Sequence, residues 1–404
     1  MNYKTDDNRY VHWLSGVPNL GNKKKKQLVD ILGSEKEVFF AKENTLEKLS
    51  VNTFEEDGSR CDQILLTPKQ VGQILQVEKK ESLLKEWNQL LLNSIEIVGI
   101  FDEKYPEKLK TILDSPYSLY YIGELPQNHI LTMAVVGARY CSDYGKFMAR
   151  QYGMTMARAG ILLVSGMARG VDGISQRAAL EAGGKTYAVL GCGVDICYPV
   201  ENRELYDGIK KQGGIISEYQ PGTLPKPQLF PPRNRIISGL SDGVVVVEAK
   251  EKSGTFITVD MALEQGRDVF AVPGRVTDAL SKGCNQLIRQ GASMATSPQE
   301  VISEYFDRGS CGSHNVIKKE TEDKKSGENK KYVNLLLTES EKRVLSHLSV
   351  IPKSIVQIYE DLNRNIEDLE TIISIAMLMS DLINLCEKGL VLQKSLNMYV
   401  LCEK

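Results

Sequence analysis

The sequence predicts an α/β protein whose centre is a doubly wound parallel sheet, and three observations lead to that prediction. Short apolar runs recur through the centre of the 404-residue chain, at a spacing that fits repeated βαβ units. These runs are apolar at both alternating positions, as in strands covered on both faces. The segments between them have helical periodicity, and one ends at Gly160, a residue typical of helix C-caps. Six strands are therefore expected, at residues 133–137, 161–166, 186–191, 213–218, 243–249 and 268–274.

Residues 1–95 are expected to form a separate domain of helices. A short turn from Gly16 to Gly21 lies between two apolar segments, and four lysines, Lys23 to Lys26, follow it. The turn resembles a helix–hairpin–helix element, in which backbone N–H groups bind a DNA phosphate. The other interpretation is a helical adaptor whose lysines are solvated.

The rest of the chain divides into the sheet domain, a linker and a small terminal domain. The sheet domain is expected over residues 96–308, and residues 309–331 have the polar, charged composition of a linker. Apolar periodicity returns in residues 332–404, where Thr338 and Glu341 fit a capping box. Three helices and a strand–turn–strand tail predict a winged helix.

Composition and charge restrict the kind of function. The formal net charge is −2, so an anionic ligand must be held by local geometry and not by overall attraction. The chain begins without a signal-peptide pattern, and no apolar run reaches the roughly 20 residues that span a bilayer. We therefore expect a cytoplasmic protein that does not bind membranes. The eight cysteines form no C-x₂-C pair and the four histidines are far apart, so neither a metal site nor histidine catalysis is expected.

The predicted strands end in glycine or small polar residues, which suits phosphate binding. In a parallel sheet, ligands bind at the carboxyl ends of the strands, where helix N-termini expose N–H groups. The first such loop, "GARYCSDYG", lacks the G-x-G-x-x-G spacing of a dinucleotide site, and the chain has no Walker A sequence. NAD and ATP are not supported, and no cofactor is expected. Several such loops along one edge favour a ligand with phosphates in a row, such as a nucleic acid strand.

The stretch "LFPPRNRIISGL" places two arginines before an apolar run, where a charge needs a partner. Arg233 and Arg235, with Arg139 and Arg169 after strand ends, are expected to bind phosphates through paired hydrogen bonds. Phe230 offers a face on which an unpaired base can stack, with a core position as the alternative. If the segment is helical, Arg233 and Arg235 lie about 200° apart around its axis. One would then bind phosphate, and the other would brace the fold or a dimer.

The motifs of the central domain resemble those of the DNA-processing protein A family (DprA/Smf). The segments that carry the resemblance occur in the family's order and include "SGMARGVDG", "AVLGCGVDICYPVEN", "FPPRNRIISGLSDGVVVVEA" and "SGTFITVDMALEQGRDVFAVPG". The resemblance implies an extended Rossmann-like domain, with a SAM-like helical domain before it and a winged helix after it. It also implies a homodimer that binds single-stranded DNA, competes with single-strand-binding protein and loads the RecA recombinase during natural transformation.

Thirteen positions are expected to contact DNA, from the residues themselves and from the family's binding loops. They are Gly137, Arg139, Ser165, Gly166, Arg169, Lys226, Phe230, Arg233, Asn234, Arg235, Ser253, Gly254 and Thr255. The sequence departs from the family pattern at Ser175 and Gln176, where many members have Ala-His, and at Val200, where a lysine is common. Replacing Arg233 and Arg235 together by alanine is expected to weaken binding at least tenfold and to leave the fold intact.

Two functions of other kinds compete with a DNA binder that has no catalytic activity. One is a nucleotide-hydrolysing enzyme of the phosphoribohydrolase type, in which Glu248 or Glu264 would serve as acid or base. The other is an adaptor that binds proteins and makes only minor DNA contacts.

Overall fold

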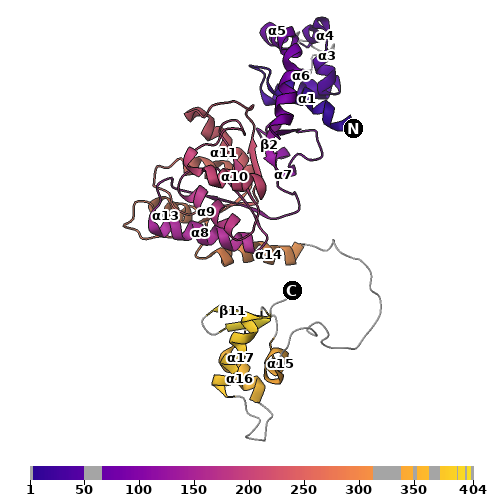
Figure 1. The fold of residues 1–404 in the computed structure, drawn as a ribbon. Helices are drawn as coiled ribbons and strands as arrows, with labels where there is room; N and C mark the ends of the chain where they lie inside the picture. The colour runs from indigo at the N-terminus through magenta and orange to yellow at the C-terminus, as the bar shows by residue number, and fades with distance from the viewer. Residues whose placement is uncertain are drawn as a thin grey trace, which may run out of the picture. The chain divides into compact units, whose positions relative to one another are not determined.

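The computed structural model describes residues 3–49, 66–312, 338–348, 353–363, 374–388, 390–395 and 398–401. They belong to two compact units, residues 1–314 and 315–404 (Figure 1). Most of the predicted linker, residues 313–331, lies outside the described residues. The boundaries predicted at residues 95 and 308 stay predictions.

A nine-stranded sheet forms the centre of the first unit, in the order β1-β2-β6-β5-β4-β3-β7-β8-β9. From β6 to β9 all neighbouring strands are parallel, whereas β1–β2 and β2–β6 pair antiparallel. The strands are β1 (Glu96–Gly99), β2 (Ser118–Gly123), β3 (Thr132–Val136), β4 (Leu162–Ser165), β5 (Thr186–Val189), β6 (Gly213–Ser217), β7 (Gly243–Val246), β8 (Asp268–Ala271) and β9 (Ser293–Met294).

All six predicted strands are confirmed as β3 to β8, and the doubly wound sheet is confirmed with them. Alternate residues of one strand enter different cores, because successive side chains point to opposite faces. Met133 and Val135 of β3 belong to the hydrophobic core that includes Met148. Ala134 and Val136 belong to the other core, which includes Ile236. The sheet is therefore covered on both faces, which explains its continuous apolar runs.

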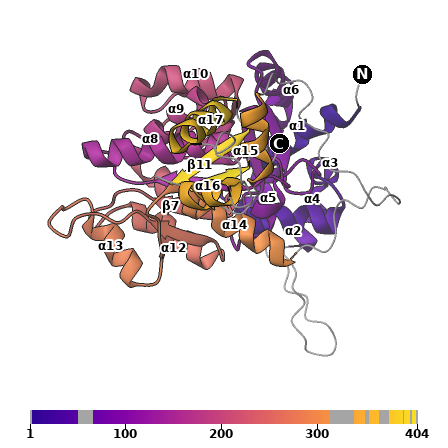
Figure 2. The same ribbon diagram turned by 90° about the horizontal axis from the view of Figure 1, so that it is seen from below.

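The crossover helices connect the strands and cover the sheet (Figure 2). One predicted helix ends as expected: α8 stops just before Gly160, whose φ of 75° is left-handed. These helices are α7 (Glu107–Lys110), α8 (Asp143–Arg158), α9 (Val171–Glu181), α10 (Arg203–Lys211), α11 (Phe230–Gly239), α12 (Thr255–Glu264), α13 (Lys282–Arg289) and α14 (Pro298–Gly312), with short 3₁₀ turns at Val200–Asn202 and Pro227–Leu229.

The described part of residues 1–95 is helical up to β1, as predicted. Its helices are α1 (Tyr3–Ser15), α2 (Asn22–Leu32), α3 (Glu35–Phe40), α4 (Glu43–Lys48), α5 (Pro68–Leu75) and α6 (Val77–Leu92). They share one buried core with β1 and β2. Buried polar groups also cross this boundary: His12 Nδ1 and the Tyr120 hydroxyl hydrogen-bond at 2.8 Å, and Ser15 and Ser118 hydroxyls at 2.6 Å. The helical region is thus packed onto the antiparallel end of the sheet.

The second unit has a separate core and a three-stranded sheet in the order β10-β12-β11. The predicted capping box is confirmed, because Thr338 and Glu341 bond reciprocally at the start of α15. The elements are α15 (Glu339–Ser346), β10 (Lys353–Ser354), α16 (Ile355–Asn363), α17 (Ile375–Glu387), β11 (Val391–Ser395) and β12 (Met398–Leu401). The three predicted helices and the two terminal strands are present, and the winged helix stays an interpretation of them.

Among the described residues, no helix is both long and apolar enough to cross a bilayer. In the same part of the chain, no cluster of three His, Cys, Asp or Glu side chains has the arrangement of a metal site.

Candidate nucleic-acid interface

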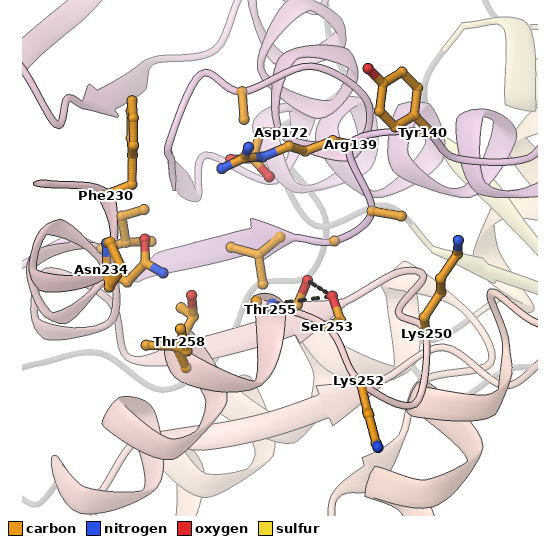
Figure 3. Close-up of a pocket in the computed structure, with 18 of the residues that line it drawn as sticks. Arg139, Tyr140, Asp172, Phe230, Asn234, Lys250, Lys252, Ser253, Thr255 and Thr258 are labelled. Carbon is orange, nitrogen blue, oxygen red and sulfur yellow. Dashed lines mark hydrogen bonds between the residues drawn. The ribbon is translucent and has the colours of Figure 1, made fainter. Parts of the chain in front are cut away.

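An open cleft of about 630 Å³ lies at the carboxyl ends of β3 and β7 (Figure 3). These two strands are neighbours, yet the chain leaves β3 toward β4 on one side and continues from β7 toward β8 on the other. The loops after the two strands therefore diverge, which opens a crevice at the point where ligands bind in open α/β sheets. The strand order therefore makes this cleft the expected place for a ligand.

The loop after β3 forms one wall of the cleft with Gly137 and Arg139. A Cβ atom at Gly137 would lie 2.8 Å from a methyl group of Val171 and 3.0 Å from the Glu248 carbonyl oxygen, so only glycine fits. The close contact presses this loop against α9 and the end of β7 and leaves the Arg139 side chain exposed. Arg139 can therefore reach an anion in the cleft.

The start of α11 forms the second wall, with Phe230 and Asn234. Pro231 and Pro232 occupy its first turn. Backbone N–H groups in the first turn have no acceptor within the helix, so proline, which lacks this group, costs no hydrogen bond there. The Phe230 ring is half-buried, 5.4 Å from the ring of Tyr198, and the guanidinium carbon of Arg139 lies 5.9 Å from its centre. Phe230 is thus a cleft residue within an aromatic and cationic cluster, which makes it available for base stacking.

The loop after β7 completes the cleft with Ser253, Gly254 and Thr255 and adds Lys250 and Lys252. The Ser253 hydroxyl accepts the backbone N–H of Thr255 at 3.2 Å and lies 3.0 Å from the Thr255 hydroxyl (Figure 3). The first N–H groups of α12 are therefore engaged within the loop. Phosphate binding here would rest on the lysines and hydroxyls more than on the helix N-terminus.

The cleft carries a local excess of positive charge in a protein of net charge −2. Arg139, Lys250 and Lys252 are exposed at its rim, and Asp172 is the acidic residue of the described lining. Burial raises the pKa of the Asp172 carboxyl, and the nearby Arg233 guanidinium lowers it. The carboxylate accepts the Gly166 N–H at 3.1 Å. Asp172 therefore belongs to the floor of the cleft, where Arg233 compensates its charge.

Arg233 lies beneath the cleft wall and is 5% exposed. Its Nη1 group donates to the carbonyl oxygens of Gly166, at 3.0 Å, and of Val189. Gly166 begins the loop after β4 and Val189 ends β5, so the guanidinium joins α11 to two strand ends. Arg233 is not among the residues that line the cleft.

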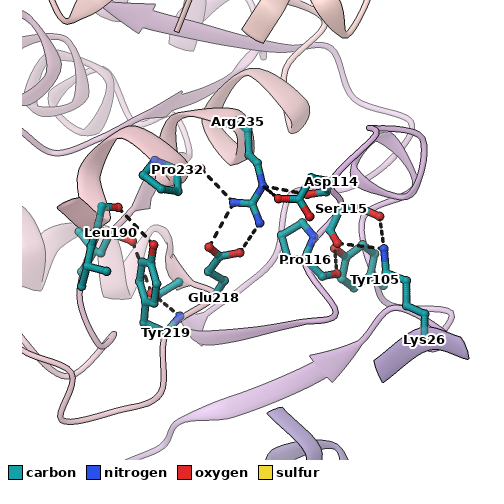
Figure 4. Close-up of polar contacts among 12 residues, drawn as sticks. Lys26, Tyr105, Asp114, Ser115, Pro116, Leu190, Glu218, Tyr219, Pro232 and Arg235 are labelled. Atoms are coloured by element: carbon teal, nitrogen blue, oxygen red, sulfur yellow. Dashed lines mark hydrogen bonds and ion pairs between the residues drawn. The ribbon is translucent and has the colours of Figure 1, made fainter. Parts of the chain in front are cut away.

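Arg235 is not among the residues that line the cleft, and it holds α11 to the segment after β6 and to the loop before β2 (Figure 4). Its guanidinium binds the Glu218 carboxylate with two hydrogen bonds, of 3.1 and 2.5 Å, and donates to the Asp114 carbonyl at 2.8 Å. Only 7% of the residue is exposed. The expectation that both arginines can be replaced without harm to the fold is therefore corrected, because each removal leaves buried acceptors unpaired.

The other predicted contacts divide in the same way. Ser165 and Gly166 are buried at the end of β4, and the Ser165 hydroxyl donates to the Val135 carbonyl at 2.7 Å. Arg169 is exposed but pairs with Glu201, and Lys226 is exposed beside the cleft without lining it. The structure thus brings together seven of the thirteen positions: Gly137, Arg139, Phe230, Asn234, Ser253, Gly254 and Thr255.

The amino-acid sequence and the fold of this chain both resemble those of known proteins. Residues 96–306 match the family of DNA recombination-mediator protein A. The chain belongs to this family. The DNA processing protein DprA of Streptococcus pneumoniae is 45% identical over 207 residues, which are 51% of this chain and 73% of that protein. DprA of Bacillus subtilis is 41% identical over 215 residues, 53% of this chain and 72% of that protein. The X-ray structure of the S. pneumoniae protein matches with a TM-score of 0.61 and 35% identity, over 73% of this chain and 97% of that one.

In this family member, the carboxylates proposed for hydrolysis lie outside the cleft lining. Glu248 is 2% exposed, and its Oε2 accepts the backbone N–H of Ser142 at 2.9 Å, so it fixes the start of α8. Glu264 is exposed at the end of α12. Neither position favours acid–base chemistry in the cleft.

Sequence reasoning missed several cleft residues, namely Tyr140, Asp172, Tyr198, Lys250 and Lys252. The segment "EAKEKSGTF" carries the signal for the two lysines, because both stand just before a glycine loop at a strand end. The intervening Glu251 made the segment look neutral. No sequence signal brings Tyr198 beside Phe230, since 31 residues lie between them and only the fold places them together.

Proposed function

We propose that this protein binds single-stranded DNA in the cleft between the ends of β3 and β7. The observation that carries the proposal is that three cations, Arg139, Lys250 and Lys252, line the same cleft as the Phe230–Tyr198 aromatic pair. Cations neutralise phosphates, and an aromatic face stacks on a base that has no partner strand. Bases within a duplex are already stacked, so the arrangement favours single strands.

We further propose that the bound strand is protected and then passed to the RecA recombinase during natural transformation in the cytoplasm, with the protein acting as a homodimer. Support comes from the family, whose description is a recombination mediator, and from the S. pneumoniae and B. subtilis relatives, which are named DNA processing proteins. Competition with single-strand-binding protein for the same strand belongs to this proposal.

A salt titration of binding tests the first part. Three phosphate contacts at roughly −0.7 each give a slope of about −2 for log affinity against log salt. We expect this slope for a poly(dT) oligonucleotide in fluorescence anisotropy, with much weaker binding of a duplex of equal length. Equal affinity for both DNA forms would reject the cleft as a single-strand site.

RecA loading needs its own assay. Strand exchange on DNA coated with single-strand-binding protein should be stimulated by the wild-type protein and not by a variant with the three cleft cations replaced. Stimulation by that variant would instead support an adaptor that acts through protein contacts.

A further inference from the structure

Two consecutive residues of α11, Arg233 and Asn234, differ in their access to the cleft. Asn234 lines the cleft and is half-buried, whereas Arg233 lies behind it and is almost fully buried. The Arg233 Nε group donates a hydrogen bond to Asn234 Oδ1 at 3.2 Å. A guanidinium has donors and no acceptor, so the amide must turn its oxygen toward Arg233. This contact fixes which way round the amide lies.

With its oxygen held, the Asn234 amide presents its Nδ2 group to the cleft. Figure 3 shows this side chain on the α11 wall, across from Thr255 and Thr258 of α12. Within residues 3–49 and 66–312, no protein acceptor is found for Nδ2. The amide is therefore a neutral donor with a fixed direction and a free N–H group at the ligand side.

Arg233 itself is not available to a ligand. Its Nη1 group donates to the Gly166 and Val189 carbonyls, and its charge compensates the buried Asp172. Its guanidinium carbon also lies 5.9 Å from the centre of the Phe230 ring. One buried side chain thus contacts both the stacking residue and the amide of the same wall.

We propose that Arg233 is a positioning residue and that the Asn234 amide donates a hydrogen bond to an acceptor oxygen of the bound DNA strand. The inference rests on the proposed function. It adds that α11 contributes a neutral hydrogen-bond donor to the cleft, whereas its two arginines do not bind phosphate. The acceptor is a phosphate oxygen or a base carbonyl oxygen, which have the same hydrogen-bonding chemistry.

A neutral donor and a cation differ in a measurable way. A hydrogen bond from an amide displaces no counterion, whereas each cation–phosphate contact contributes roughly −0.7 to the salt slope. Loss of the Asn234 donor should therefore lower affinity and leave the slope unchanged. Loss of Arg139 should change both.

The decisive substitution is Asn234→Asp, because aspartate keeps an oxygen for Arg233 and has no N–H group. In anisotropy titrations with poly(dT), we expect at least about tenfold weaker binding by Asn234→Asp and about tenfold by Asn234→Ala, the size of one hydrogen bond to a charged group. The matched control is Gln290→Glu, which makes the same change at an exposed amide outside the cleft lining. Wild-type affinity in Asn234→Asp would overturn the proposal.

The positioning role is tested by a double-mutant cycle with Arg233→Lys. Lysine keeps the charge beside Asp172 but lacks the Nε donor that holds the amide. In this background Asn234→Ala should weaken binding less than about twofold, and a full tenfold loss would show that Arg233 does not position the amide. Thermal melting checks that Arg233→Lys is folded, and if it is not, the Asn234→Asp result still decides the donor.

The two acceptor sources are separated by the strand used. An Asn234→Ala penalty that is equal on poly(dT), poly(dC) and poly(dA) indicates a phosphate oxygen, because every strand has the same backbone. A penalty confined to the pyrimidine strands indicates the base carbonyl. Failure of the wild-type protein to bind any single strand would instead reject the proposed function, and this outcome is distinct from either of the others.

Discussion

The lysine run of α2 and the cations of the cleft show how differently positive charge can be used in one chain. Lys23 to Lys26 are consecutive, yet three of them donate to protein acceptors: Lys24 to Gln70, Lys25 to the Ser15 carbonyl and Lys26 to the Ser115 carbonyl, at 2.9, 2.6 and 2.9 Å. Arg139, Lys250 and Lys252 are scattered in sequence but meet at one rim. The dense run holds segments of the protein together, and the scattered set lines the cleft where we propose that anions bind.

The role of a positively charged side chain therefore depends more on the acceptors that surround it in the fold than on how many such residues are consecutive in the sequence. Lys26 reaches the loop that Arg235 braces from the other side, since its partner Ser115 follows Asp114 (Figure 4). Among the described residues, only Lys23 of the four is exposed without a partner, so the lysines add little to the helix–hairpin–helix interpretation of the Gly16–Gly21 turn, which stays a prediction.

The largest effect is expected from replacing Arg233 and Arg235 together by alanine. The change leaves Asp172 and Glu218 without their buried partners, and breaking a buried pair costs about 3–5 kcal/mol. Urea denaturation should show a loss of at least this size, with the loss of DNA binding following from unfolding. A double variant of wild-type stability that fails to bind DNA would make these arginines ligand contacts and contradict their bracing role.

The next largest effect should come from the cleft cations. We expect the variant Arg139→Ala, Lys250→Ala, Lys252→Ala to bind poly(dT) about a hundredfold more weakly and to lose most of a salt slope of about −2. Its melting temperature should stay near that of the wild type, because the three side chains are exposed. An unchanged salt slope would place the phosphate contacts elsewhere.

A smaller effect distinguishes two lysines of the same run. Lys26→Ala should lower the free energy of unfolding by about 1 kcal/mol, since it removes the hydrogen bonds that the half-buried ammonium group donates to Ser115. Lys23→Ala, the matched control, removes the same charge at an exposed position and should change neither stability nor DNA affinity. If Lys23→Ala reduced the salt slope, the run would contact phosphate after all.

The smallest effect concerns His12, at the boundary between the helical region and the sheet. Burial lowers the pKa of His12 from its ordinary value of 6.5, and the contact with Glu86 opposes this shift. Below pH 6.5 the unfolded chain therefore binds more protons at this site than the folded protein. The stability that neutral His12 provides is present above pH 6.5 and falls as the pH drops from there toward the lowered pKa.

Urea titrations between pH 5 and 8 measure this dependence. The wild type should lose more stability on acidification than His12→Gln, which cannot titrate. Parallel curves for the two proteins would mean that the contact between α1 and β2 does not depend on a neutral histidine.

The sheet could be predicted because its strands are covered on both faces, so each shows an uninterrupted apolar run. Strands β1 and β2 were not predicted, since they lie at the antiparallel end and "SLYYIG" mixes tyrosines with aliphatic residues. The cleft loops were predicted from the rule that ligands bind at strand ends. Five of the expected contacts lie there for that reason, whereas Phe230 and Asn234 come from the start of α11.

What the sequence could not provide is the partner of each charged group. Arg235 is far from Asp114 along the chain, and 121 positions separate the donor from its carbonyl acceptor. The pattern R-N-R therefore looked like unpaired charge before a strand, when the fold supplies acceptors from four other segments, at Asp114, Gly166, Val189 and Glu218. Asn234, between the two arginines, is the member of the motif that reaches the cleft.

The most direct test of the central claim is a photocrosslink between single-stranded DNA and the protein. An oligonucleotide with 5-iododeoxyuridine at single positions should be irradiated in complex with the full chain, and the crosslinked peptides identified by mass spectrometry. The structure predicts crosslinks at Tyr198 or Phe230, the aromatic pair of the cleft. Crosslinks confined to α1–α6 or to residues 338–401, with none in the cleft, would contradict the account.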